Sequence, residues 1–113
     1  MSKISFEGIG EVAATFACEA EVQAGQVVGL TGDGTVGPCE SGGRICGVAL
    51  SSEDGYAAVQ IGGLCRVAKT GEEVTPGFAK LSADGTGGMK KDEAGGTEYL
   101  VLRVESDGMV IRL

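Results

Sequence analysis

Four cysteines carry the most reactive side chains of this 113-residue sequence: Cys18, Cys39, Cys46 and Cys65. No two of them form a CxxC pair, and the sequence contains no histidine that could complete a zinc site. No general base accompanies any of them to generate a thiolate. The sequence therefore predicts free thiols that pack as small apolar side chains in a reducing compartment, although an even number of cysteines leaves two disulfides open.

Four aspartates, each followed by glycine, are the next candidates for chemistry: Asp33, Asp54, Asp84 and Asp107. A calcium loop needs several oxygen ligands at alternate positions and a distal glutamate, whereas each aspartate here stands almost alone. Asp-Gly pairs between apolar runs are typical of tight turns, because these residues accept a positive φ. We predict turns at these positions, tight hairpins at Asp54-Gly55 and Asp107-Gly108, and neither a metal site nor a cofactor site.

The charge balance argues against binding to nucleic acid. Nine basic residues stand against sixteen acidic ones, giving a formal charge of −7. Five scattered aromatic rings form no stacking platform: Phe6, Phe16, Tyr56, Phe78 and Tyr99. We expect most of these rings to lie in the core. The Ser41–Arg44 run and the Lys90-Lys91 pair are predicted to be surface loops. Without a catalytic constellation, the chain is predicted not to be an enzyme.

Glycine divides the chain into short segments that read as strands. There are 21 glycines, and apolar and β-branched residues alternate between them. The longest glycine-free stretch, residues 11–24, is rich in Ala and Glu, yet its alternation favours a strand over a helix. Further strands are predicted at residues 3–6, 26–30, 44–50, 56–61, 64–68, 78–81, 99–104 and 109–113. Gly62-Gly63 is expected to break or redirect a strand.

Two halves of the sequence repeat the same order of signals. Leu30 and Leu81 are 51 positions apart, as are Asp33 and Asp84, whereas the Asp-Gly pairs at 54 and 107 differ by 53. Reuse of Asp-Gly turns in any glycine-rich β protein would give a similar impression, so a true duplication and chance both stay open. The predicted fold is all-β: a small, glycine-rich β-barrel or β-clip sandwich with a possible internal two-fold repeat.

The first ten residues are predicted to form an N-terminal arm, and residues 11–113 a single β domain. Ile4, Phe6 and Ile9 are candidate contacts with a partner, by addition of a strand to a neighbour. The alternative is an edge strand of the protein's own sheet. No apolar run approaches the ~20 residues that span a membrane, and no secretory leader is recognised.

One known family shares the order of these segments. The segments are Ala24-Gly25-Gln26-Val27-Val28, then Gly47-Val48-Ala49, then residues 55–67 (GYAAVQIGGLCRV), Val74-Thr75-Pro76-Gly77 and Asp84-Gly85. In this order the chain resembles the capsid cement, or head decoration, proteins of tailed phages over residues 11–86. The apparent hairpin of residues 99–113 departs from the family pattern.

The resemblance implies a non-enzymatic structural protein that binds the outer capsid lattice and stabilises the head. Its partners would be the major capsid protein and further copies of itself, as a homotrimer. It would lie on the outer capsid surface of the virion, and in the host bacterial cytoplasm during assembly. The alternative is a small ligand- or carbohydrate-binding β module.

Overall fold

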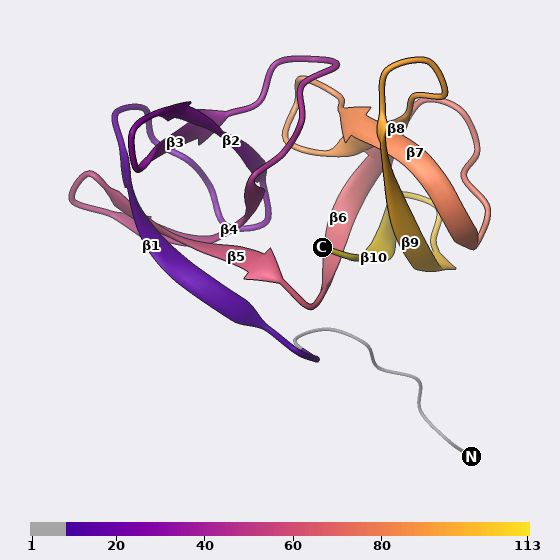
Figure 1. The fold of residues 1–113 in the computed structure, drawn as a ribbon, viewed down its shortest axis with the longest axis horizontal. Helices are drawn as coiled ribbons and strands as arrows, with labels where there is room; N and C mark the ends of the chain where they lie inside the picture. Colours follow the sequence, from indigo (N-terminus) through magenta and orange to yellow (C-terminus); the bar gives the residue numbers. More distant parts are fainter. Residues whose placement is uncertain (1–8) are drawn as a thin grey trace.

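The computed structural model describes residues 9–113, and Figure 1 shows two small barrels side by side, one at each end of the molecule. Within these residues every regular element is a strand. The prediction of an all-β fold is therefore confirmed. The strands are β1 (Val12–Cys18), β2 (Val27–Gly32), β3 (Thr35–Pro38), β4 (Gly47–Glu53), β5 (Tyr56–Gly62), β6 (Leu64–Thr70), β7 (Gly77–Ala83), β8 (Met89–Lys91), β9 (Thr97–Val104) and β10 (Gly108–Arg112).

The two barrels have the same topology. The first is closed in the order β1-β3-β2-β4-β5, and the second joins β6-β8-β7-β9-β10 in a closed ring. Each has one parallel pair, β1 with β3 and β6 with β8, and antiparallel pairing elsewhere. The predicted two-fold repeat of the sequence thus corresponds to two similar halves of the structure.

A β-bulge marks the same place in both barrels. Leu50 is the extra residue of β4 opposite β5, and Leu102 is the extra residue of β9 opposite β10. The two residues are 52 positions apart, and a bulge of this kind bends the strand as a small barrel requires. A shared bulge is stronger support for the repeat than shared turn residues, because it fixes the register of two strands.

The two hairpins that follow the bulges are built differently. Asp54 and Gly55 have φ of 52° and 80° and form the turn between β4 and β5, as predicted. Between β9 and β10, Glu105 N–H donates to the carbonyl of Gly108, so the turn residues are Ser106 and Asp107. The prediction of an Asp107-Gly108 turn was wrong by one residue. Gly108 instead begins β10, where a Cβ would meet the Arg66 guanidinium at 2.5 Å.

Gly62-Gly63 redirects the chain from one barrel to the other, as predicted. β5 ends at Gly62 and β6 begins at Leu64, and Gly63 has φ of +87°. The backbone of Gly10 packs so closely here that a Cβ on Gly63 would come within 2.5 Å of it. Leu64 N–H donates to the carbonyl of Ile9 at 2.9 Å, so the start of the described chain is held at this crossing.

Each barrel encloses its own group of buried apolar residues. The first is filled by small side chains: Cys18, Val22, Val28, Val36, Ala49, Ala57 and Val59. The second has larger ones: Cys65, Val67, Val74, Leu81, Ala83, Met89, Val101, Met109 and Ile111, joined by Val27 and Val48 of the first barrel. Because two residues of the first barrel complete the core of the second, the halves share a buried boundary.

Backbone hydrogen bonds also cross between the barrels. Val27 N–H donates to the carbonyl of Gly87 (3.0 Å), Gly42 N–H to that of Ala83 (2.8 Å), and Ala83 N–H to that of Gly43 (3.0 Å). The predicted Ser41–Arg44 surface loop is largely exposed, but the two bonds at Gly42 and Gly43 hold it against the second barrel. The pairing satisfies polar groups that the contact between the barrels would otherwise bury.

Most predicted strands occur close to their expected positions, with four differences. The stretch of residues 11–24 contains a strand, but only over Val12–Cys18, and the strand expected at 44–50 begins at Gly47. Two short strands, β3 and β8, were missed, because Gly37 and Pro38 lie in β3 and Lys90 and Lys91 lie in β8. The prediction of a surface loop at Lys90-Lys91 was therefore wrong. The strand expected at residues 3–6 lies outside the described residues.

The expected burial of the aromatic rings was wrong for two of them. Tyr56 is 60% exposed and Phe78 is 66% exposed, whereas Phe16 and Tyr99 are half-buried against the two cores. Tyr56 follows the β4–β5 turn, and Phe78 pairs with Leu100 on the outer side of the second barrel. Alternation along a strand places such residues outside when the neighbouring positions fill a narrow interior.

Candidate interaction surface

An open groove of about 420 Å³ lies where the barrels meet. We call it the inter-barrel groove; its lining comprises Arg44, Ile45, Cys46, Ile61, Phe78, Thr97, Glu98, Tyr99, Leu100, Arg112 and Leu113. The first barrel supplies residues 44–46 and Ile61, and the second barrel supplies the rest. The C-terminus, which Figure 1 shows between the two barrels, belongs to this lining.

Strand pairing in the second barrel explains one wall of the groove. Phe78 of β7 is opposite Leu100 of β9, which is opposite Arg112 of β10. Residues opposite one another in antiparallel strands point to the same face of a sheet. The three side chains therefore form an outward-facing row in which an exposed aromatic ring and a leucine stand beside a guanidinium.

Ile61 reaches the groove because of a second irregularity in the first barrel. Val12 pairs with Gly62 and Ala13 with Gln60, so Ile61 is an extra residue in β5. Simple alternation would place Val59 and Ile61 on one face of the strand, but this bulge turns Ile61 outward, where it is 40% exposed. Gln60 becomes buried instead, and its amide donates to the carbonyls of Gly62 (3.0 Å) and Leu64 (3.1 Å).

Tyr99 and Arg44 bring polar groups to the groove. Burial raises the pKa of the Tyr99 phenol, while the positive charge of Arg44 acts in the opposite direction. The phenol therefore stays neutral at physiological pH and can donate a hydrogen bond. Apolar walls combined with a few polar groups suit the recognition of another molecule.

None of the four cysteines forms a disulfide, in agreement with the predicted free thiols. Cys18 is buried, with its Sγ 3.7 Å from the Ser52 hydroxyl. Burial raises the pKa of the Cys39 and Cys46 thiols, and raises that of Cys65 to about 12. A thiol with a raised pKa is a poor nucleophile at neutral pH, so these side chains act as packing groups.

Two of the Asp-Gly aspartates, Asp84 and Asp107, accept hydrogen bonds that hold local structure. Asp84 accepts hydrogen bonds from the Thr70 hydroxyl (2.8 Å), from the N–H and hydroxyl of Thr86 and from Gly88 N–H. Burial alone would raise the pKa of Asp84, but these hydrogen bonds together lower it. Asp107 accepts a bond from Arg66 at 2.9 Å. Within residues 9–113, no group of three or more His, Cys, Asp or Glu side chains is placed to hold a metal ion.

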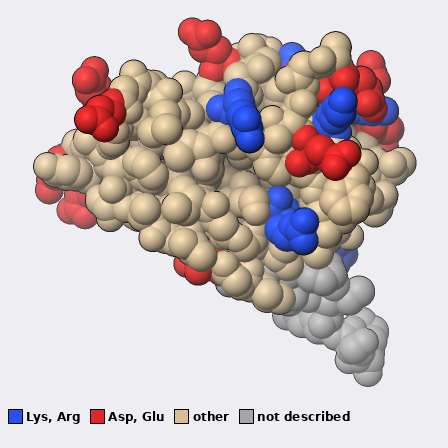
Figure 2. Space-filling view, in the orientation of Figure 1, with Lys and Arg blue, Asp and Glu red and all other residues tan. Residues whose placement is uncertain are grey.

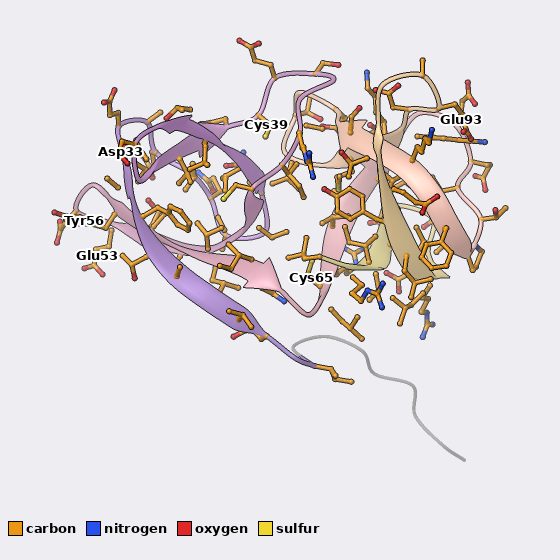
Figure 3. The ribbon with its side chains drawn as sticks, in the orientation of Figure 1. Asp33, Cys39, Glu53, Tyr56, Cys65 and Glu93 are labelled. Atoms are coloured by element: carbon orange, nitrogen blue, oxygen red, sulfur yellow. The ribbon has the colours of Figure 1, made fainter. Side chains whose placement is uncertain are left out.

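A second surface feature lies at the far end of the first barrel. We call it the acidic tip: Tyr56 together with Glu19, Glu21, Glu53 and Asp54, the four carboxylates that line a hollow of about 290 Å³. Figure 3 shows Tyr56 and Glu53 at the outer end of the first barrel, away from the second. Tyr56 pairs with Ala17 and Glu53, so its backbone is fixed while its ring is exposed.

Of the three predicted contact residues, the structure describes only Ile9. Its side chain is 56% exposed, and Val12, at the start of β1, is 54% exposed. Ile4 and Phe6 lie outside the described residues. The predicted contact at Ile9 therefore stays a prediction, with an exposed apolar side chain available for it. Sequence reasoning missed the groove, because β5 had to be known to bulge before Ile61 could be placed beside Phe78.

Comparison with models of known protein families finds no match, and no curated protein matches the sequence. Within residues 9–113, no helix is long and apolar enough to cross a bilayer.

Proposed function

We propose that this chain is a non-enzymatic structural protein that binds other protein chains through exposed apolar surfaces, as phage head decoration proteins do. The observation that carries the proposal is the inter-barrel groove, where Phe78 and Ile61 are exposed beside Leu100 and Leu113. Exposed apolar side chains that gather in one place mark interaction sites. The order of glycine- and valine-rich segments supports the capsid lattice as the partner.

The proposed contact with the major capsid protein is the N-terminal arm, Ile4, Phe6 and Ile9, continued by Val12. Ile9 and Val12 are both more than half exposed; Val12 begins β1, and Ile9 lies three residues before it. In this proposal the protein lies on the outer capsid surface and its copies associate, as trimers, above the points where capsid subunits meet. Many weak contacts, repeated over a lattice, would give firm attachment.

Co-sedimentation tests this function. The protein is mixed with expanded heads of the phage or prophage that carries the sequence, and bound protein is measured after sedimentation. We expect wild type to sediment with heads, and the double substitution Ile9→Ser with Val12→Ser to reduce binding. Leu30→Ser, which changes an exposed residue of β2 outside both surfaces, is the matched control. Wild type that remains in the supernatant would contradict the capsid function.

The groove favours one alternative, a small-ligand site. Its volume lies within the range of about 300–1,000 Å³ that small-molecule sites occupy. A screen of sugars and other small metabolites by thermal shift distinguishes the two functions. A large rise in the melting temperature with one compound, abolished by Phe78→Ala, would support the ligand-binding module.

A further inference from the structure

We propose that copies of this chain associate head to tail, with the acidic tip of one copy seated in the inter-barrel groove of the next. This inference rests on the self-association in the proposed function and adds the two surfaces that make it. The groove offers apolar walls and two guanidinium groups, Arg44 and Arg112, against one carboxylate, Glu98. The tip offers an exposed aromatic ring beside four carboxylates.

The charges of the two halves are unequal in a way that suits this arrangement. Residues 9–62 contain one basic residue, Arg44, against seven acidic ones: Glu11, Glu19, Glu21, Asp33, Glu40, Glu53 and Asp54. That single cation lines the groove, whereas four of the seven acids line the tip. Figure 2 shows only acidic side chains at the first-barrel end of the face in view, whereas basic side chains lie among further acidic ones toward the middle and the second barrel. Opposite charges on separate surfaces steer two copies into one orientation.

The Tyr56 side chain is suited to insert into the groove of another copy. Aromatic side chains dominate the energetics of interfaces when they enter a pocket, and tyrosine adds a polar end. The groove contains Phe78 and Leu100 for the ring, and Arg44, Arg112 or Tyr99 for the hydroxyl. Burying one such ring and pairing its flanking carboxylates with the arginines gives a compact contact centre.

The tip cannot reach the groove of its own molecule. The β4–β5 turn stands at the outer end of the first barrel, whereas Phe78, Leu100 and Arg112 belong to the second barrel (Figures 1 and 3). Backbone bonds hold the tip in place, because Cys18 N–H donates to the carbonyl of Gly55 at 2.9 Å. The occupant must therefore come from another copy. A contact between two different surfaces closes into a ring or continues as a filament.

A mixing experiment tests the contact. Tyr56→Ala removes the ring of the tip, and Phe78→Asp places a like charge in the groove; both positions are exposed, so both variants are expected to fold, which circular dichroism verifies. Wild type is expected to associate in sedimentation equilibrium, and each variant alone to be monomeric. An equimolar mixture is expected to give a dimer, because the Phe78→Asp copy keeps its tip and the Tyr56→Ala copy keeps its groove. Leu30→Asp, an exposed position outside both surfaces, is expected to associate like wild type.

Three results would overturn the inference. They are a wild-type chain that stays monomeric at the concentrations of an NMR sample, variants that associate like wild type, and a mixture that stays monomeric. Charge reversal gives a second, independent readout. Arg44→Glu is expected to lower association at least tenfold. Mixing this variant with a copy that carries both Glu21→Lys and Glu53→Lys is expected to restore part of the association.

The outcome separates this contact from the capsid function. If copies associate head to tail but do not bind heads, the capsid function fails and the contact stands. If the chain binds heads while Tyr56→Ala and Phe78→Asp behave like wild type in self-association, the contact fails and the capsid function stands.

Discussion

The first barrel (β1–β5) and the second barrel (β6–β10) share one topology and one bulge position, yet they are filled by side chains of different size. At positions related by 52 residues in the strand registers, Ala49, Ala57 and Val59 correspond to Val101, Met109 and Ile111, and all six are buried. The same ring of strands therefore accepts a small or a large interior. Turns, bulges and registers define the barrel, and the volume of the core is free to differ.

The smaller barrel also contributes to the larger one. Val27 and Val48 belong to strands of the first barrel but pack in the core of the second. With three crossing backbone hydrogen bonds, this makes the halves dependent on each other. We expect one cooperative unfolding transition in urea, with the same midpoint by fluorescence of Tyr56 and Tyr99 and by circular dichroism.

The largest effect is expected from truncating the larger core. Met109→Ala removes a fully buried side chain from the second barrel and should cost about 2–5 kcal/mol of unfolding free energy. Val59→Ala, in the first barrel, removes fewer atoms and should cost less. Urea denaturation measures both as shifts of the midpoint at constant m. Equal costs in unfolding free energy would mean that the two cores are packed more alike than the sizes of their side chains indicate.

Gly47 tests a second contrast between the barrels. It corresponds to Tyr99 by strand register, but a Cβ on Gly47 would clash with the carbonyl of Gln60 and lie 2.8 Å from a Val59 methyl. Gly47→Ala should therefore cost about 1–3 kcal/mol by overpacking. Gly34→Ala, at a turn where nothing lies within 4 Å, is the control for strain without crowding, since its φ is +62°. A cost at Gly47 no larger than that at Gly34 would show that the close approach is relieved by a small shift.

The contrast between the barrels also shows how far sequence reasoning reaches. Alternation predicted a strand over residues 109–113, where the structure has β10 (Gly108–Arg112), and Asp-Gly chemistry predicted the turn at Asp54. These signals are local, because they depend on residues within one or two strands. The all-β class and the two similar halves followed from them.

Irregular positions were beyond the same reasoning. A bulge shifts every later side chain of the strand to the other face of the sheet. No residue type in the sequence predicted the bulges at Leu50, Ile61 and Leu102. The exposure of Ile61 depends on such a shift, and that of Phe78 on a narrow barrel interior. The groove also needs residues 44–46 beside β9, a contact between segments about fifty residues apart. The candidate site was thus missed, because it depends on bulges and on contacts between distant segments rather than on a local sequence pattern.

Asp84 and Asp33 occupy matching places in the sequence repeat but differ in their bonds. Asp84→Asn should cost about 1–2 kcal/mol near neutral pH, because it weakens hydrogen bonds to a carboxylate from Thr70, Thr86 and Gly88. Asp33→Asn should change the free energy of unfolding very little. Because the folded-state pKa of Asp84 is lowered, its contribution is complete above the unfolded pKa of about 4 and is lost as pH falls through the folded value.

Urea denaturation of wild type and both variants, at neutral pH and at pH 3, measures these differences in unfolding free energy. The gap between wild type and Asp84→Asn should narrow in acid. A gap that widens in acid would mean that the protonated carboxyl is the better partner for this loop.

The smallest expected effect separates the two hairpins. The second one is held by side chains: Arg66 Nε donates to Glu105 and Arg66 Nη2 to Asp107, both at 2.9 Å, and these groups are well exposed. Exposed pairs contribute at most about 1 kcal/mol and are screened by salt. Asp107→Asn should therefore cost under about 1 kcal/mol at low salt and almost nothing in concentrated salt. Asp54→Asn should show no such salt dependence, because backbone geometry forms that turn and asparagine accepts its positive φ. If instead both variants respond to salt alike, the net charge of −7 rather than a local pair governs the response, and the two hairpins are equivalent after all.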